Sequence, residues 1–264
     1  MGCRMKPATT ISKVCRVLGE FRHRPCLGVT ELARRTDLLP SDIHRILASL
    51  RHCGFVEQNP QTKTYRLGVG LMKIGLAAFQ RNELREAARP LLLRLSEEVE
   101  ATAHLAIFDP QEFDIFLADQ FDSSAEIPFK ANFGATAAAH CTALGKAIMA
   151  NIDPTVALQY LEQKGTPRTA PNTITQLAAL ESELRKTQHQ GFSLDLEESA
   201  GGACCVGAPV RDWTGATVGA ISVSMPSQRF YRLQPVTLTS AVRATAMELS
   251  QIVGFQAVGL SVRT

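Results

Sequence analysis

The sequence predicts a chain of two domains: a small helical domain that ends in a two-stranded β-wing, and a larger α+β domain with an antiparallel sheet. The length of 264 residues fits one or two domains at about 150 residues each. Residues 1–75 carry thirteen Lys and Arg against five Asp and Glu, whereas residues 76–264 carry fifteen against twenty. The strand-like segments of the second part come in pairs typical of hairpins and do not alternate strictly with helices.

The composition is that of a globular chain. Hydrophobic residues make up 45% and charged residues 20%, which excludes a disordered or low-complexity chain. No run of about 18 apolar residues exists, so we expect no membrane partner. The start of the chain lacks the apolar segment of a secretory signal, and the seven cysteines are scattered. We therefore expect a cytoplasmic protein without disulfides.

The first predicted helix lies in residues 10–21, TISKVCRVLGEF. Its apolar residues recur at helical spacing and form one stripe, which consists of Ile11, Val14, Val17, Leu18 and Phe21. Pro25 and Gly28 follow within a loop and end the helix.

Residues 29–55 show the spacing of a helix-turn-helix. Thr30 is a good N-cap for a helix that begins at Glu31, and Leu38 lies where the turn must be filled. Ile43 and Ile46 are spaced to anchor a second helix inward. This leaves the polar side of the second helix free to enter the major groove of double-stranded DNA.

The segment FVEQNPQTKTYRLG, residues 55–68, alternates apolar and polar residues around the turn signal Asn59-Pro60-Gln61. This pattern predicts a β-hairpin, the wing of a winged helix-turn-helix. Basic side chains on the wing are suited to phosphate contacts. The predicted DNA-contacting residues of the whole domain are Thr30, Ser41, Asp42, His44, Arg45, Ser49, Lys63 and Arg66.

Two positions of this domain leave alternatives open. Asp37 occupies the turn position that usually holds glycine, although Asp tolerates left-handed backbone less well. Asp42 either accepts a hydrogen bond from a cytosine or stabilises the start of its helix, and we favour the second interpretation slightly. The alternative for the whole block is a small basic domain that binds protein.

A connecting helix and the first helix of the second domain are predicted on either side of Asn82. Pro90 is expected to kink or restart the second of these helices. The apolar stripe of the connecting helix either forms a dimer contact or packs on its own domain. The predicted boundaries are 1–75 for the DNA-binding domain, 76–82 for the linker helix and 83–264 for the second domain.

The second domain is expected to combine six strands with four further helices. The strands are predicted at 102–109, 114–121, 127–133, 192–198, 203–212 and 217–225. The helices are predicted at 142–150, 154–163, 174–189 and within 235–253. Turns at Pro110-Gln111 and at residues 213–216 join two pairs of strands into hairpins.

Signatures of enzymes and metal sites are missing from the sequence. There is no H-E-x-x-H, G-x-S-x-G or C-x-x-C motif, so we expect no catalytic residues, no metal and no cofactor. Gly145-Lys146 lacks the rest of a phosphate-binding loop. The adjacent Cys204 and Cys205 lie in a strand, where successive side chains point to opposite faces.

Two parts of the sequence resemble the IclR family of bacterial transcription regulators. The first is TELARRTDLLPSDIHRILASLRHCGFVEQNPQTKTYRLG, and the second is HCTALGKAIMA, followed by PRTAPNTIT and GFSLDLEESAGGACCVGAPVRDWTGATVGAISVS. Their order and spacing match, and the resemblance covers nearly the whole chain. The most discriminating positions are Gly191, Asp195, Glu198, Cys205, Val206, Gly207, Val210 and Asp212.

The resemblance implies a DNA-binding domain joined by a helix to an effector-binding domain related to GAF and profilin-like folds. It implies a homodimer or homotetramer that binds an operator, represses or activates a small catabolic operon, and responds to a small carboxylate or aromatic effector. Carried onto this sequence, the family's effector pocket comprises Ala143 and Leu144 through their backbone, and Asp195, Cys205, Ser222 and Ser224.

The residue chemistry agrees with these positions. Ser222 and Ser224 are two apart in a strand and so face the same side, which Cys205 on a neighbouring strand can share. The amides of Ala143, Leu144 and Gly145 would open a helix capped by Thr142, and such amides attract an anion. Phe129 is expected to line the apolar side of the pocket, as is Phe133. In the alternative view, Asp195 is bonded to a nearby turn, and the two serines lie on a solvated strand face.

The sequence departs from the family at two places: Cys204 replaces a long polar or basic residue, and Pro40 lies one position late. Two other functions compete with the regulator. One is a GAF-like redox enzyme in which Cys141, Cys204 or Cys205 reacts. The other is a DNA-binding regulator that has lost its effector.

Overall fold

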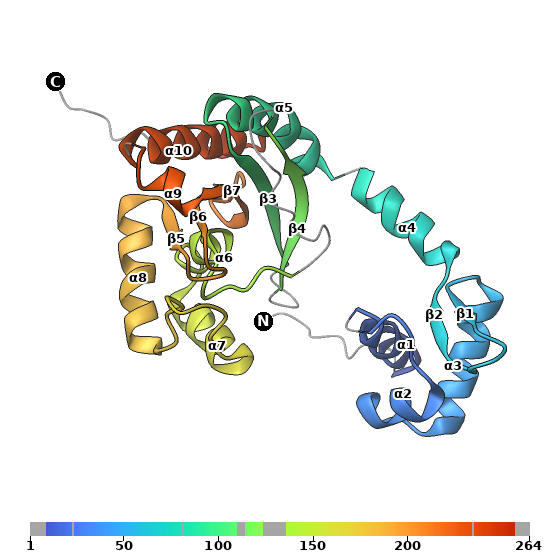
Figure 1. Cartoon of the computed structure of the whole chain (residues 1–264). Coiled ribbons are helices and arrows are strands. Elements are labelled where there is room, and N and C mark those ends of the chain that lie inside the picture. Colours follow the sequence, from blue (N-terminus) through green and yellow to red (C-terminus); the bar gives the residue numbers. More distant parts are fainter. Residues whose placement is uncertain are drawn as a thin grey trace. The chain divides into compact units, whose positions relative to one another are not determined.

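The structure is a computed structural model that describes residues 9–22, 24–80, 82–109, 114–123, 136–233 and 235–256. The chain divides into two compact units, Met1–Asn82 and Glu83–Thr264 (Figure 1). None of the helices in the described ranges is long and apolar enough to cross a membrane.

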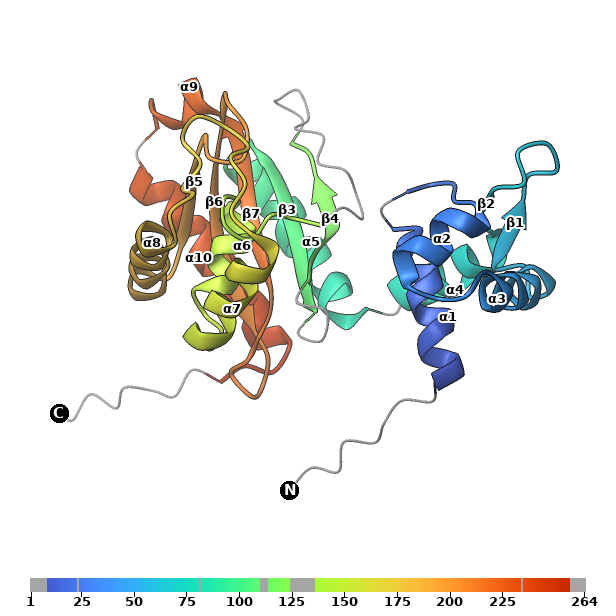
Figure 2. The same cartoon turned by 90° about the horizontal axis from the view of Figure 1, so that it is seen from below.

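The first unit contains four helices and one hairpin within its described residues. In chain order these are α1 (Thr9–Glu20), α2 (Val29–Thr36), α3 (Pro40–His52), β1 (Val56–Gln58), β2 (Tyr65–Leu67) and α4 (Val69–Gln80). The two strands pair antiparallel, and Figure 2 shows their hairpin standing out beside α3. Leu27 adds an isolated bridge to Tyr65.

Apolar side chains of the three N-terminal helices meet in the core of this unit. Leu32 of α2 and Ile43 and Leu47 of α3 are fully buried, together with Val17 of α1. Asp37 ends α2 in the left-handed conformation, with φ 51° and ψ 38°, so the turn does require this unusual backbone here. This is the arrangement of a winged helix-turn-helix, as the sequence predicted.

One local prediction for this unit is wrong. Helix α2 begins at Val29 with Gly28 as its N-cap, so Thr30 lies within the first turn and does not cap it. Thr30 is nevertheless exposed on the unit's surface. In the predicted apolar stripe, Val17 and Phe21 are buried and Val14 and Leu18 are partly buried, whereas Ile11 is 65% exposed.

The second unit is built on a five-stranded antiparallel sheet in the order β4-β3-β7-β6-β5. The strands are β3 (Thr102–Asp109), β4 (Asp114–Phe121), β5 (Ser193–Leu196), β6 (Ala203–Arg211) and β7 (Thr217–Pro226). The helices are α5 (Glu83–Glu98), α6 (Ala143–Met149), α7 (Pro154–Lys164), α8 (Leu177–Gln190), α9 (Ser227–Phe230) and α10 (Pro235–Ile252). The antiparallel α+β architecture is confirmed.

The two faces of the sheet differ in character. Helices α5 and α10 cover one face, where alternate strand residues such as Leu105, Val206 and Val223 form a dry core (Figures 1 and 2). Helices α6 and α7 lie on the other side. There, α6 packs on β6 and β7, and α7 and α8 complete a second apolar cluster. Part of this second face is polar.

Helix α5 runs through Pro90 without interruption, so the predicted restart of the helix does not occur. The tertiary contacts of α5 with α10 and β3 hold it in place despite the lost backbone hydrogen bond. Helix α8 begins three residues later than predicted, and the short α9 was not predicted. The turn predicted at Pro110-Gln111 and the strand predicted at 127–133 lie outside the described residues.

Candidate functional site

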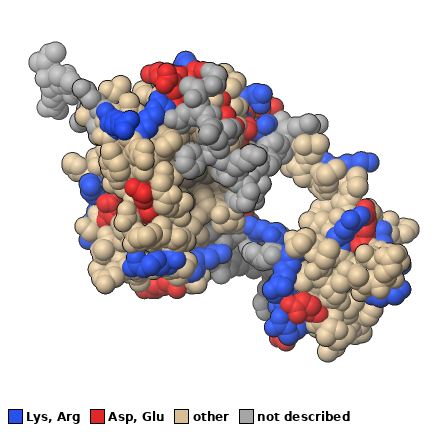
Figure 3. All heavy atoms as spheres, in the orientation of Figure 1, with Lys and Arg blue, Asp and Glu red and all other residues tan. Residues whose placement is uncertain are grey.

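Helix α3 presents a polar side to solvent because its apolar residues all turn inward. Ile43, Ile46, Leu47 and Leu50 are buried, and the residues between them form the outer side. Ser41, His44, Arg45 and Ser49 on that side are exposed. In Figure 3, Lys and Arg side chains gather along one edge of the N-terminal unit, with Asp and Glu among them.

The Asp42 carboxylate is already hydrogen-bonded to side chains of its own unit. Its carboxylate accepts a hydrogen bond from Lys13 Nζ of α1 at 2.6 Å and another from Arg45 at 3.2 Å. These bonds, that of Lys13 above all, lower the pKa of the carboxyl below its ordinary value. Asp42 therefore joins the first turn of α3 to α1, which favours its stabilising role over a base contact. The Arg45 side chain remains 74% exposed.

The wing is held in shape by its own turn. The Asn59 side-chain oxygen accepts hydrogen bonds from the amides of Gln61 and Thr62, an Asx-turn of the kind that the Asn-Pro-Gln signal predicts. Lys63 is exposed and has a left-handed φ of 58°. Arg66 lies across the hairpin from Glu57 and pairs with it at 2.8 Å.

The polar part of the sheet lies in the second unit, on the face opposite the α5–α10 core. In the strand register, Asp195 pairs with Cys205 and Cys205 with Ser224, so their side chains share one face. One step along the strands, Ser222 pairs with His104 of β3. We call these five residues, Asp195, Cys205, Ser222, Ser224 and His104, the polar patch.

Three members of the polar patch contact one another in a row. Cys205 Sγ lies 3.0 Å from Ser224 Oγ, and Ser224 Oγ lies 3.5 Å from His104 Nδ1. Ser222, Ser224 and His104 are all more than 90% buried. The structure thus brings together four of the predicted effector residues on one buried surface, and the two serines do not lie on a solvated face.

Asp195 is bonded to the turn that follows β5. Its carboxylate accepts hydrogen bonds from the amides of Glu198 at 2.8 Å and Ser199 at 3.2 Å, and from the Ser199 hydroxyl. Burial raises the pKa of the Asp195 carboxyl, and these hydrogen bonds oppose the shift. Asp195 therefore both borders Cys205 and shapes the loop beside it.

Helix α6 packs closely on the sheet beside the polar patch because Gly207 leaves room for its backbone. A Cβ added at Gly207 would lie 2.7 Å from the Ala143 carbonyl oxygen, and the Ser193 hydroxyl donates to that same oxygen at 2.6 Å. The Thr142 side chain caps the helix by accepting from Gly145 N at 3.0 Å. The expectation that the Gly145 amide is available to an anion is therefore wrong. The amides of Ala143 and Leu144 precede the first internal bond of α6.

A buried ion pair beside the patch was missed by the sequence analysis. Lys146 of α6 is fully buried, and its Nζ lies 2.5 Å from Glu198 Oε1 and 3.7 Å from Glu183. Burial raises the pKa of Glu198, which Lys146 opposes. Glu198 links α6 to the turn that Asp195 holds. The sequence drew attention to this lysine only through Gly145-Lys146, which resembles part of a phosphate-binding loop. No local pattern indicated its partner, which lies 52 residues further along the chain.

His104 was also missed. His104 lies in the strand TAHLAIFD on the face that packs against α6, where the neighbouring residues Ala106 and Phe108 are small or apolar. A single polar residue among apolar strand residues is the sequence signal that could have identified His104. Burial lowers its pKa to about 4, so its imidazole is neutral at physiological pH.

The cysteines do not fit the redox alternative. Burial raises the pKa of the Cys141, Cys204 and Cys205 thiols, so each is protonated near neutral pH and is a poor nucleophile. The six cysteines within the described ranges are free thiols. No cluster of three His, Cys, Asp or Glu suited to a metal occurs among the described residues. Phe129 and Phe133 lie outside them.

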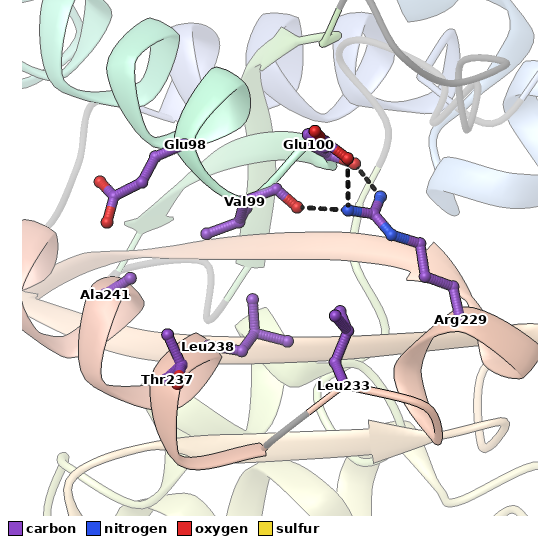
Figure 4. A pocket seen from close by; sticks show the side chains of 8 residues that line it. All are labelled: Glu98, Val99, Glu100, Arg229, Leu233, Thr237, Leu238 and Ala241. Atoms are coloured by element: carbon purple, nitrogen blue, oxygen red, sulfur yellow. Dashed lines mark hydrogen bonds and ion pairs between the residues drawn. The ribbon is translucent and has the colours of Figure 1, made fainter.

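A separate hollow of about 410 Å³ lies between the end of α5 and α10, on the other side of the sheet (Figure 4). Its cation, Arg229, turns toward the chain itself and donates to the carbonyl of Val99 and to Glu100. Leu233, Leu238 and Ala241 line the rest with Thr237 and Glu98. The cation of this hollow is therefore already paired, whereas in the polar patch the buried His104 Nε2 has no hydrogen-bond partner among the described residues.

A winged helix-turn-helix joined to a domain with a buried polar patch defines a DNA-binding regulator with a ligand-binding domain. Comparison with known families agrees. Residues 76–251 match the family described as "Bacterial transcriptional regulator IclR C-terminal", and residues 10–60 match "IclR helix-turn-helix domain". The chain belongs to the IclR family of transcriptional regulators, which are not enzymes.

Individual relatives support this assignment. The HTH-type transcriptional regulator BhcR of Paracoccus denitrificans is 34% identical over 85% of this chain and 80% of its own. The crystal structure of the Thermotoga maritima IclR is 27% identical, with a TM-score of 0.66 over 93% of this chain and 99% of its own. An IclR homolog from Microbacterium hydrocarbonoxydans, complexed with 4-hydroxybenzoate, shares the fold at 22% identity, with a TM-score of 0.72 over 93% and 99% of the two chains.

Proposed function

We propose that this regulator controls a small catabolic operon by binding operator DNA and changing its DNA affinity when a small organic acid or aromatic acid occupies the polar patch. The observation that carries the proposal is the patch itself. Hydroxyl and imidazole groups lie buried on the sheet beneath α6, in contact with the half-buried thiol of Cys205. Buried polar groups of this kind require hydrogen-bonding partners, which a small polar ligand supplies.

The DNA interface in this proposal consists of the outer side of α3 and the wing. Arg45, His44, Ser41 and Ser49 face solvent together and enter the major groove. Lys63 and Arg66 of the wing contact phosphates, where Arg66 must exchange its bond to Glu57 for one to the DNA. Thr30 approaches the backbone from α2, and Asp42 acts by orienting Arg45.

The effector site in this proposal uses the polar patch and the start of α6. Ser222, Ser224 and the amides of Ala143 and Leu144 hold a carboxylate, as the family resemblance implies. Cys205 contributes a protonated thiol, because burial raises its pKa. Asp195 acts through the turn it holds and through its neighbour Cys205. A bound 4-hydroxybenzoate in the related Microbacterium protein supports an acid of similar size.

We infer a homodimer from helix α4. Val69, Met72 and Leu76 recur on one side of this helix, and each is more than half exposed. Three such residues on a 12-residue helix form an apolar stripe that a second copy would cover. A dimer would place two α3 helices on two half-sites about one helical turn of DNA apart. Sedimentation of a Met72→Glu variant tests this, since the charge should shift the protein towards monomer.

The test of the regulator function uses the purified full-length protein and DNA from upstream of its own gene. Binding is measured at about 50 and 200 mM salt, with unrelated DNA of equal length as the control. We expect preferential binding that weakens steeply with salt, because phosphate contacts release counterions. Equal affinity for both DNAs at every salt concentration would contradict the proposal. A panel of small acids then tests the effector class by thermal stabilisation.

A further inference from the structure

One nitrogen of the polar patch has no partner. His104 is only 4% exposed, and its register partner is Ser222 on the same face of the sheet. Its Nδ1 faces Ser224 Oγ, at 3.5 Å. Its Nε2 is buried and has no hydrogen-bond partner anywhere in the described part of the chain. The ring thus has one end directed at a predicted effector residue and the other end unsatisfied.

An unsatisfied buried nitrogen needs a physical reason. Burial removes water from it, and in native proteins such groups nearly always find a protein, water or ligand partner. A purely structural residue at this place would be better served by an apolar side chain, as Ala106 and Phe108 provide further along the same side of β3. The polar nitrogen is therefore left for a group that the described residues do not supply.

The charge of the ring limits what it can recognise. The neutral imidazole has one donor and one acceptor nitrogen and carries no charge to balance a carboxylate. The hydroxyls of Ser222 and Ser224 lie on the same face and are better suited to the carboxylate oxygens. The group left for His104 is an uncharged oxygen of the ligand, either a hydroxyl or a carbonyl.

We propose that His104 Nε2 hydrogen-bonds a hydroxyl or carbonyl oxygen of the effector, and so selects oxygen-substituted acids over unsubstituted ones. This inference rests on the proposed effector site and adds a specificity-determining residue to it. The effector class becomes narrower: small acids with a second, uncharged oxygen function, such as 2-oxo, 2-hydroxy or hydroxyaryl acids.

The test compares matched acids on the full-length protein by calorimetry. The probes are pyruvate and lactate against propionate, and 4-hydroxybenzoate against benzoate. Two variants dissect the ring: His104→Asn keeps an amide near Nδ1 but has nothing at Nε2, whereas His104→Gln places an amide near Nε2. Wild type should prefer an oxygen-substituted acid by at least about tenfold, the worth of one buried hydrogen bond.

The expected result is that His104→Asn reduces this preference to about twofold or less, while His104→Gln retains most of it, with both ligand-free variants still folded. Two results would overturn the role of His104: wild type binds both acids of every pair equally, or His104→Asn keeps the wild-type preference. If no acid in the panel binds wild type, the proposed effector class fails, and the role of His104 fails with it.

Discussion

Arg45 and Arg66 of the DNA-binding unit form ion pairs at its surface, whereas the second unit buries Lys146 against Glu198. Arg45–Asp42 and Arg66–Glu57 each leave an arginine more than 60% exposed, while the Lys146 side chain has no exposure at all. Exposed pairs contribute little to stability and exchange partners readily, which suits side chains that must turn to DNA. A buried pair does not exchange partners in this way, and Lys146–Glu198 links α6 to the turn beside the polar patch.

The largest expected effect comes from breaking the buried pair. Replacing Lys146 with Met leaves Glu198 buried without its cation, which should lower the free energy of unfolding by about 3–5 kcal/mol. Urea denaturation measures this change. The control is Arg185→Ala, which breaks an exposed pair with Glu181 and should change stability by less than about 0.5 kcal/mol. A loss in Lys146→Met no larger than in the control would remove the distinction between the two kinds of pair.

Acidification should lower the free energy of unfolding, because His104 is buried as a neutral ring. Its pKa is 6.5 when unfolded and about 4 when folded, so folding favours the neutral ring. The resulting stability is complete above about pH 6.5 and is lost as the pH falls towards 4. Between pH 7 and 5, wild type should lose about 2 kcal/mol more than His104→Gln, which does not titrate. Parallel pH profiles for the two proteins would show that His104 titrates normally in the fold.

On the DNA side, Arg45→Ala should act on binding and not on folding. The exposed guanidinium makes only a weak pair with Asp42, so the free energy of unfolding should change by less than about 0.5 kcal/mol. Operator affinity should fall by about tenfold, the loss expected for one base or phosphate contact. Fluorescence anisotropy with labelled operator measures it. Unchanged affinity would remove Arg45 from the interface and leave α3 without its principal contact.

The smallest effect is expected at the wing. Lys63→Ala should weaken binding to operator and to unrelated DNA by the same factor and reduce the salt slope by about 1, because it removes one phosphate contact. Titrations at several salt concentrations provide the slope. A selective loss on operator alone would mean that Lys63 reads bases and does not merely contact phosphate.

Local patterns predicted most elements of both units. Helical spacing located α1 to α3, the Asn-Pro-Gln signal located the wing, and strand alternation placed Cys204 and Cys205 on opposite faces. The predictions were wrong where contacts with other parts of the fold, and not the local sequence, determine the start or continuity of a helix. Pro90 does not restart α5, because tertiary packing outweighs the lost hydrogen bond. Gly28 is the N-cap of α2, two residues before Thr30, the residue that capping preference favoured.

The candidate site was predictable only in part. Strand spacing and family resemblance predicted the serines and Cys205 as site residues, and the strand register confirms that Cys205 and Ser224 share a face. Lys146–Glu198 and His104–Ser224 join residues 52 and 120 positions apart, and no local pattern carries such a pairing. Both contacts are important because their side chains are buried, and burial cannot be determined before the chain is folded.

Ser224 offers the most direct test of the link between the patch and the DNA, because its hydroxyl lies between Cys205 and His104. Operator affinity is measured for wild type and Ser224→Ala, with and without the acid that stabilises wild type most. We expect the acid to change wild-type affinity by at least about fivefold, the lower range of allosteric coupling, and to leave Ser224→Ala unchanged at the same concentration. An equal response in both proteins would contradict an effector site at the polar patch.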